Sequence, residues 1–126
     1  MKFSNLLLIY NDMKRAHQLL TLASMLAMPS PLLAGASSFA VVNGSGSDIM
    51  TMAIRRVGSG QWLPLGAAPQ TGKSAAVIFS DPDCAFDLRA TLVGGASVTW
   101  SGVNLCDVKL VTLRRNAAGL AWVDYD

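Results

Sequence analysis

Glutamate is absent from the 126-residue chain, and histidine occurs once, at His17. Charged residues make up only 14% of the sequence, which leaves few side chains for acid–base chemistry. Ser-His-Asp catalysis, Cys-His catalysis and histidine-ligated metal sites all need a histidine, so none of them can be built from residues 37–126. We therefore expect the chain not to be an enzyme, and to bind no cofactor or metal ion.

The sequence also lacks an apolar run of the ~20 residues that a membrane-spanning helix needs. The run Leu19–Met28 is ten residues long; it follows Lys14-Arg15 and precedes the small residues Ala34-Gly35-Ala36. A basic start, a short apolar core and a small-x-small site are typical of a secretory signal peptide. We therefore predict a signal peptide over residues 1–36, with translation starting at Met1 or at Met13.

Cleavage after Ala36 leaves residues 37–126 as a single domain. Cleavage after Ala40 is the alternative, but it would remove the start of the first expected strand. An uncleaved anchor helix is a second alternative, opposed by the short run and by Pro29 and Pro31, which break helices. We expect a periplasmic or secreted protein with no stable membrane insertion after cleavage.

A surplus of positive charge is missing from the expected mature domain. Residues 37–126 contain seven lysines and arginines and seven aspartates, so the net charge of +2 belongs to the leader. Binding to nucleic acid depends on such a surplus, because most of the affinity comes from contacts with phosphates. We therefore expect no nucleic-acid partner.

Cysteine is scarce, and the two that occur are Cys84 and Cys106. In an oxidising compartment two cysteines are more often bonded than free. We predict a disulfide between them, with a pair of buried free thiols as the alternative.

Short apolar or alternating runs, separated about every ten residues by glycine, proline, serine and aspartate, are typical of strands. We expect four strands before Gly94-Gly95-Ala96, at residues 39–42, 49–57, 74–79 and 84–93. One strand follows directly after these three residues, and two more cover 108–113 and 120–125. The pattern predicts an all-β fold, a small antiparallel β-sandwich of about seven strands, for which immunoglobulin-like topology is one option.

Gly94-Gly95-Ala96 can form a three-residue hairpin loop. That loop would place Leu92 opposite Val98 and Ala90 opposite Trp100. The same register puts Cys84 directly opposite Cys106, at a spacing that a disulfide can bridge.

This register also makes predictions about single residues. Gly102 would lie opposite Leu88, and Asn104 opposite Phe86, both on the inner face. Asp87 and Arg89 would lie on the outer face as ordinary solvated surface.

Three motifs have competing interpretations. Thr71–Ser74 resembles the end of a phosphate-binding loop, but Ala67 replaces the required glycine, so we predict a turn. Asp81, Asp83 and Asp87 could collect around calcium, although a turn and an outward strand position explain them more simply. Asn43-Gly44-Ser45 matches the glycosylation tripeptide, and a turn with positive φ is the simpler interpretation.

Several segments together resemble a family of small exported bacterial proteins of unknown function. They are Phe39–Asn43, Trp62 with Leu65-Gly66, Cys84–Arg89, which fits C-x-[FY]-D-[LIV]-R, and Gly102–Cys106, which contains N-[LV]-C. The resemblance covers nearly all of residues 39–113. It implies export, paired cysteines and an all-β domain, and it implies no activity.

The leading functional hypothesis is a non-enzymatic exported binding module whose partner is an unknown protein or envelope component. A domain this small has little room for a deep pocket beside its core, so recognition would use loops or a strand edge. Trp62, Arg55 and Arg56 form our candidate binding surface. The alternative is a secreted inhibitor of an envelope or foreign hydrolase, with residues 58–69 inserted into the target cleft.

Overall fold

The computed structural model describes residues 35–126 as an all-β fold of eight strands. The expected signal peptide, with its two possible starts, lies outside the described residues except for Gly35 and Ala36 of its cleavage motif, and Ala36 is the buried first residue of β1. The strands are β1 (Ala36–Gly44), β2 (Ile49–Arg56), β3 (Leu63–Pro64), β4 (Ser74–Asp81), β5 (Ala85–Leu92), β6 (Ser97–Asn104), β7 (Leu110–Arg115) and β8 (Ala121–Tyr125). This part of the chain has no helix long and apolar enough to cross a membrane.

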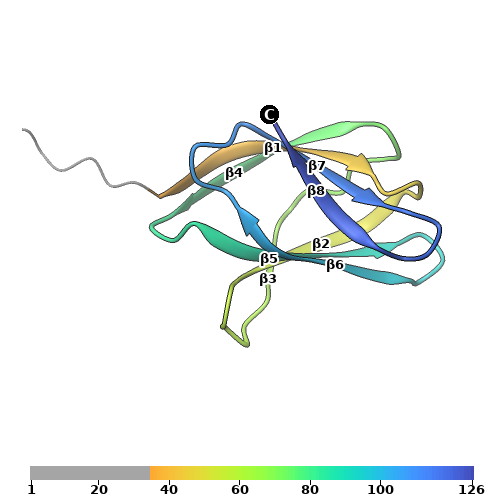
Figure 1. The fold of residues 1–126 in the computed structure, drawn as a ribbon, viewed down its shortest axis with the longest axis horizontal. Coiled ribbons are helices and arrows are strands. Elements are labelled where there is room, and N and C mark those ends of the chain that lie inside the picture. The colour runs from red at the N-terminus through yellow and green to blue at the C-terminus, as the bar shows by residue number, and fades with distance from the viewer. Residues whose placement is uncertain (1–34) are drawn as a thin grey trace, which may run out of the picture. The chain divides into compact units, whose positions relative to one another are not determined.

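The strands form two four-stranded sheets, which lie as two layers in Figure 1. One sheet has the order β4-β1-β7-β8, and the other has the order β3-β2-β5-β6. The predicted β-sandwich is therefore confirmed. The eighth strand is β3, two residues in a segment that the sequence pattern assigned to a loop.

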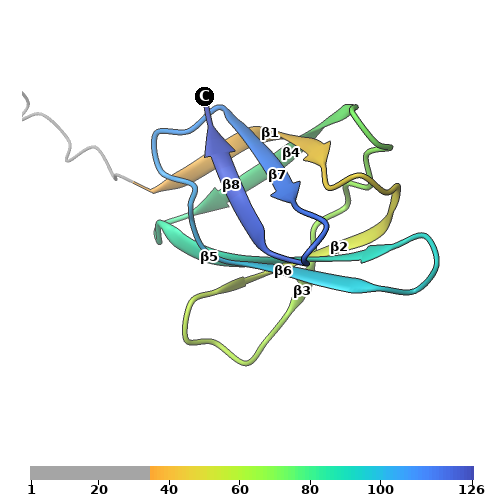
Figure 2. The ribbon, with the colours of Figure 1, turned by 45° about the vertical axis from the view of Figure 1, so that its right-hand side comes forward.

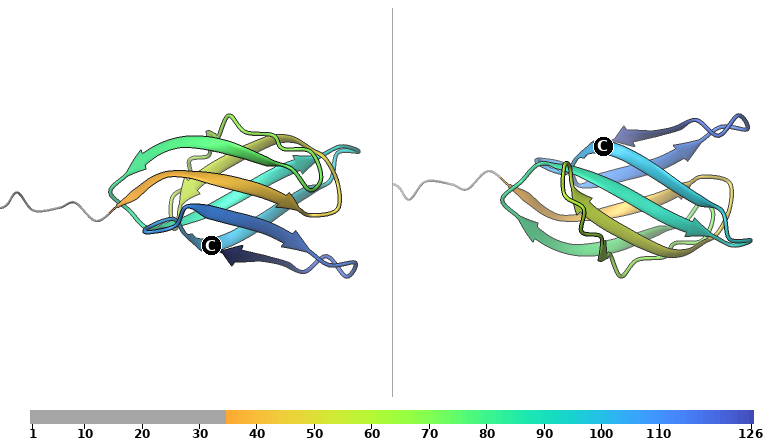
Figure 3. Two further views of the ribbon diagram at one scale, coloured as in Figure 1. Left: turned by 90° about the horizontal axis from the view of Figure 1, so that it is seen from above. Right: turned by 90° about the horizontal axis from the view of Figure 1, so that it is seen from below.

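One strand pair departs from the expected antiparallel arrangement. β1 and β7 run parallel, with Ala40 paired to Leu110 and Val42 to Thr112, and they lie side by side in Figure 3. Parallel neighbours need a connection that crosses between their ends. Strands β2 to β6 supply that connection, because the chain leaves the first sheet after β1 and returns to it at β4 and again at β7.

Aromatic side chains link the two layers through the core. The ring of Phe79 packs edge-on against Phe39 and Phe86, with centroid distances of 6.1 and 5.3 Å. Trp100 on β6 is buried, and its Nε1 donates a hydrogen bond to the carbonyl oxygen of Arg114 on β7 at 2.9 Å. The indole thus contributes apolar burial and a polar link between the sheets.

The β5–β6 hairpin turns one residue earlier than predicted. Leu92 N donates to Ala96 O at 2.8 Å and Gly95 N to Leu92 O at 2.9 Å, so the loop covers residues 93–95. Ala90 therefore lies opposite Val98, and the predicted register is wrong by two positions on β6 at this end of the hairpin. Both Gly94 and Gly95 have positive φ, so either glycine can occupy a left-handed loop position, and the sequence pattern alone does not choose between them.

A β-bulge then shifts the register back. Phe86 pairs with Val103 and Leu88 with Trp100, which leaves two residues of β6 opposite Asp87 alone. One of these is Gly102, whose φ of 66° is rarely adopted by other residues. Gly102 is exposed and does not face Leu88 on the inner side, which corrects the prediction.

The disulfide prediction is confirmed although the register that suggested it is wrong. Cys84 and Cys106 are bonded, with their Cα atoms 5.0 Å apart. Beyond the bulge Ala85 pairs with Asn104, and Leu105 N donates to Cys84 O at 2.9 Å. The bulge shifts the register by one residue, and the step from the Ala85–Asn104 pair to the cysteines shifts it by one more. Together the two shifts cancel the two-residue error at the loop and bring Cys84 to Cys106. Asn104 is exposed, where an inner position opposite Phe86 was expected.

Candidate binding surface

The outer face of the β3-β2-β5-β6 sheet carries the candidate surface. Arg55 on β2 pairs with Asp87 on β5, and Ala53 pairs with Arg89, so the two arginines are diagonal neighbours on one face. In Figure 2 the loop between β2 and β3 extends away from the sandwich on this side, and the right-hand view of Figure 3 shows it in front of the sheet.

Trp62 lies on this face in contact with both arginines. The guanidinium carbon of Arg55 lies 4.4 Å from the centre of the Trp62 ring, and that of Arg89 lies 4.2 Å from it. Both distances are within the ~6 Å range of a cation–π interaction. We call Arg55, Trp62 and Arg89 the Trp62 cluster.

The short strand β3 positions Trp62. Leu63 and Pro64 pair with Ile54 and Ala53, and Leu65 N donates to Met52 O at 3.0 Å. The backbone directly after Trp62 is therefore fixed to β2. Trp62 is half-buried and lies outside the hydrophobic core.

Asp87 binds Arg55 of the Trp62 cluster, and it is buried where a solvated position was expected. Its side chain is buried; Arg55 Nε donates to Oδ2 at 2.9 Å, and Gly102 N donates to Oδ1 at 3.0 Å. The pKa of Asp87 is lowered mainly by the hydrogen bond from the Gly102 N–H. Burial raises the pKa, and the interaction with Arg55 lowers it further. The bulge supplies this N–H, so the ionised carboxylate holds β2, β5 and β6 together.

Arg89 is the member of the cluster that the sequence analysis missed. Alternation placed it on the outer face, but nothing local indicated that Trp62 would stack on it. Within residues 35–126 its guanidinium group makes no ion pair and no side-chain hydrogen bond. Stacking fixes the group while its N–H donors stay available to a partner.

Arg56, the third predicted residue, does not join Trp62. It lies next to Arg55 on β2 and binds two carboxylates, Asp81 and Asp83, each at 3.1 Å. A hollow of about 220 Å³ lies beside it between β2 and β4. Its apolar lining includes Ile54, Leu63, Phe79 and Phe86. The structure thus brings two of the three predicted residues together and assigns the third to a neighbouring ion-pair network.

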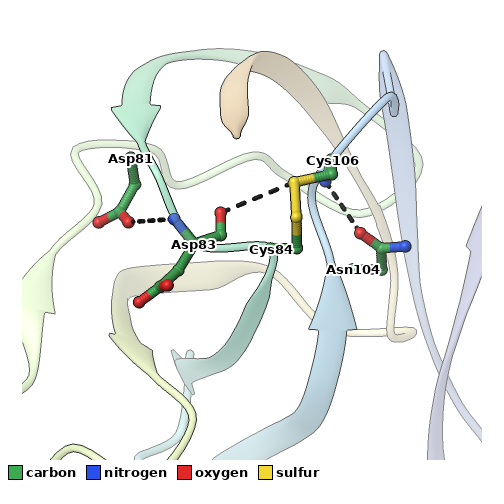
Figure 4. Close-up of a disulfide and its surroundings, with 5 residues drawn as sticks. All are labelled: Asp81, Asp83, Cys84, Asn104 and Cys106. Carbon is green, nitrogen blue, oxygen red and sulfur yellow. Dashed lines mark hydrogen bonds between the residues drawn. A yellow bond between two sulfur atoms is a disulfide. The ribbon is translucent and has the colours of Figure 1, made fainter. Parts of the chain in front are cut away.

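The disulfide closes the end of the sandwich next to this network (Figure 4). Asp83 O lies 3.7 Å from Cys106 Sγ, Asp83 N donates to Asp81 Oδ1 at 2.9 Å, and Cys106 N donates to Asn104 Oδ1 at 2.9 Å. The aspartates weighed as calcium ligands therefore bind arginines and backbone N–H groups. No three acidic, cysteine or histidine side chains within residues 35–126 are grouped so that they could hold a metal ion.

Asn43 corrects the interpretation of the Asn43-Gly44-Ser45 tripeptide. Asn43 is fully buried near the end of β1, where its Nδ2 donates to Ser47 O at 2.8 Å and Pro69 O at 3.0 Å. Its Oδ1 accepts hydrogen bonds from the N–H and the hydroxyl of Ser45. Positive φ occurs at Gly46, after the tripeptide. In the folded domain this amide is a structural junction and is closed to modification.

Comparison with known proteins adds information on the fold alone. No family model matches the chain, and no curated protein matches its sequence. A solved structure with a similar fold is the NMR structure of a protein from Eubacterium rectale, with a TM-score of 0.50 and 12% identity, covering 78% of this chain and 94% of that chain. The resemblance to a family of exported bacterial proteins stays a prediction.

Proposed function

We propose that the chain is an exported, non-enzymatic binding module that uses the Trp62 cluster to contact a protein or another component of the cell envelope. The observation that carries the proposal is the contact of Trp62 with two guanidinium groups on the outer face of a sheet. Tryptophan and arginine are the residue types most enriched at energetic centres of interfaces. A half-buried tryptophan outside the core is available for this role.

Two further observations support a location outside the cytoplasm. The Cys84–Cys106 disulfide is typical of oxidising compartments, and the leader sequence has the layout of a secretory signal. Together they favour the periplasm or the extracellular medium. The mature chain would then begin near Ser37, close to the first residue of β1.

The test is capture of the partner in the native host. The chain is tagged at Asp126 and cross-linked, and mass spectrometry identifies the captured proteins together with the N-terminus and thiol state of the bait. We expect a processed, disulfide-bonded bait with one dominant envelope protein. A bait that keeps its leader, has free thiols and captures cytoplasmic proteins would contradict the proposal.

Trp62→Ala tests whether the cluster is the contact surface. We expect capture of the partner to fall at least tenfold. The free energy of unfolding should fall by only about 1 kcal/mol for each of the two cation–π interactions, because both of them lie at the surface.

The matched control is Trp122→Ala, which removes a partly exposed tryptophan from β8 in the other sheet. This variant should capture the partner as the wild type does. Equal loss of capture in both variants, or unchanged capture in Trp62→Ala, would exclude the cluster as the binding surface.

The projection of the β2–β3 loop from the sheet also favours the alternative function, inhibition of a hydrolase by a loop inserted into its cleft. A panel of proteases and lysozymes assayed with micromolar protein tests this alternative. Slowing of one enzyme that Trp62→Ala abolishes would support inhibition, and undisturbed rates throughout would leave the binding module as the better proposal.

A further inference from the structure

The open edge of β4 is unlike the other edges of the sandwich. β4 is the outermost strand of the β4-β1-β7-β8 sheet, and among residues 35–126 it pairs only with β1. From Ser74 to Ser80 it contains no charged residue, proline or glycine. Ile78, in the middle of this stretch, is 96% exposed. In the left-hand view of Figure 3 the strand runs along the rim of the molecule.

The other three edges are protected in ways that are common in natural sheets. β3 has only two residues, β6 contains the bulge at Gly102, and β8 carries Asp124, which forms an ion pair with Arg114. β4 has a bulge too, where Ile78 and Phe79 together oppose Ser38 of β1, but it lies toward the end of the strand. Residues 74–77 pair regularly with β1 and have a regular open edge.

The backbone groups that face outward can be assigned from the ladder with β1. Asn43 N donates to Lys73 O at 3.0 Å, so the carbonyl group of Lys73 points toward β1, while Lys73 N donates to Gln70 O in the preceding turn. Hydrogen-bonding direction alternates along an antiparallel strand. Ser74 and Ala76, and Ile78 at the start of the bulge, therefore direct their N–H and C=O groups away from β1. No loop of residues 35–126 hydrogen-bonds to the backbone of Ala76 or Ile78.

The charges at the two ends of β4 indicate which strand fits this edge. Lys73 precedes the uncharged stretch, while Asp81 and Asp83 follow it and share a single arginine, Arg56, which leaves one negative charge. A second β4 placed antiparallel brings its Lys73 end to the Asp81–Asp83 end of the first strand. Parallel pairing would place like charges side by side.

We propose that two copies of this chain associate through antiparallel pairing of their β4 strands about a two-fold axis near Ala76. Antiparallel pairing of one edge with itself is the two-fold, self-complementary contact by which most homodimers form. The result is a continuous eight-stranded sheet that crosses both molecules. The Trp62 cluster lies on the other sheet of each copy, so the dimer leaves both clusters exposed.

The test is the molar mass of the protein purified from its native host, measured by sedimentation from low to high micromolar concentration. We expect the wild type to pass from monomer to dimer over this range. Ile78→Lys should weaken dimerisation at least tenfold, because a two-fold axis near Ala76 places Ile78 in the paired stretch opposite Ser74 of the second copy, and a lysine on an edge strand opposes pairing with another strand. Met50→Lys is the matched control, because Met50 is an exposed apolar residue on β2, and it should dimerise as the wild type does.

A second variant tests the backbone pairing directly. Ala76→Pro removes an N–H that faces outward and leaves the ladder with β1 intact, since proline is tolerated at such edge positions. It should retain the thermal midpoint of the wild type while losing the dimer. A wild type that stays monomeric at every concentration, or variants that dimerise as well as the wild type, would overturn the proposal.

Discussion

At the scale of single residues, two of the buried polar side chains, Asn43 and Asp87, join separate segments of the fold. Asn43 is fully buried, and its amide joins the end of β1 to the segment around Pro69. Asp87 joins three strands of the other sheet through Arg55 and Gly102. Buried polar groups are costly unless they are hydrogen-bonded, and the described residues contain no buried side-chain nitrogen or oxygen without a partner.

Replacing Asn43 should therefore destabilise the domain strongly. Asn43→Ala leaves Pro69 O and Ser45 N without their partner, while Ser47 O keeps the hydrogen bond from the Ser45 hydroxyl, and each buried polar group left unsatisfied costs about 1–3 kcal/mol. We expect a loss of about 3 kcal/mol in the free energy of unfolding, measured by urea denaturation. Asn116→Ala, which removes an exposed amide that accepts from Leu120 N, should cost less than about 1 kcal/mol. Equal losses in the two variants would contradict the role assigned to Asn43.

Asp87 should make the stability of the domain sensitive to acid. Its pKa in the folded state is lowered from 3.8, mainly by the Gly102 N–H. A lowered folded-state pKa stabilises the protein above the unfolded-state value, and this contribution is lost as the pH falls below about 4 toward the folded-state pKa. The urea midpoint of the wild type should therefore fall more steeply below pH 4 than that of Asp87→Asn.

Two comparisons isolate this effect. The pKa of Asp48 is also lowered, mainly by the backbone N–H of Thr71 and also by the Thr71 hydroxyl. Asp48 is present in both the wild type and Asp87→Asn, so its contribution cancels in the comparison. Asp124→Asn removes a different aspartate that is paired with an arginine, and it keeps Asp87 and the associated acid dependence. Parallel curves for the wild type and Asp87→Asn would show that the bulge N–H does not stabilise the carboxylate.

At the scale of elements, the β5–β6 hairpin shows what the sequence could predict. Strict alternation along β5 predicted its inward residues, and Phe86, Leu88, Ala90 and Leu92 are all buried. The register failed, because either of two glycine positions suited the loop and the sequence carries no direct sign of a bulge at Gly102. The burial of Asp87 could not be predicted for the same reason, since it depends on the N–H that the bulge turns toward β5.

The candidate site was only partly predictable, because its contacts depend on segments that are distant in the sequence. Arg55 and Trp62 were identified from residue type and position, but their contact depends on β3, whose two residues carry no periodic pattern. Arg56 was grouped with Trp62 because it is next to Arg55 in sequence. Its neighbours in space are Asp81 and Asp83, which only the packing of β2 beside the end of β4 brings near.

The disulfide that closes this hairpin should be a major source of stability. Cys84 and Cys106 are 22 residues apart, and a loop of this length predicts about 3 kcal/mol from the reduced entropy of the unfolded chain. We expect the double variant Cys84→Ser with Cys106→Ser to lose about that amount in urea denaturation. The wild type in reductant should lose the same amount, and the double variant should be insensitive to reductant. A double variant as stable as the oxidised wild type would show that the bond constrains little.

At the scale of the whole molecule, the two surfaces that we propose for association belong to different sheets of the sandwich. The outer face of the β3-β2-β5-β6 sheet carries the Trp62 cluster, and the open edge of β4 belongs to the other sheet. All-β class and a sandwich followed from the spacing of glycine, proline and aspartate. Connectivity did not, because strand patterns do not state which strands are neighbours, and the parallel β1–β7 pair left no local signal.

The position of β1 has a consequence for how the molecule assembles. Among the described residues β1 is the first strand to be synthesised, yet it lies inside its sheet between β4 and β7, and Ala40 pairs with Leu110. Contacts between residues so distant in sequence form late and slowly. The first sheet therefore stays incomplete until most of the chain has been made. Until β7 is made, the side of β1 that β7 covers has no partner, so β4 and β1 can form only an open two-stranded part of this sheet.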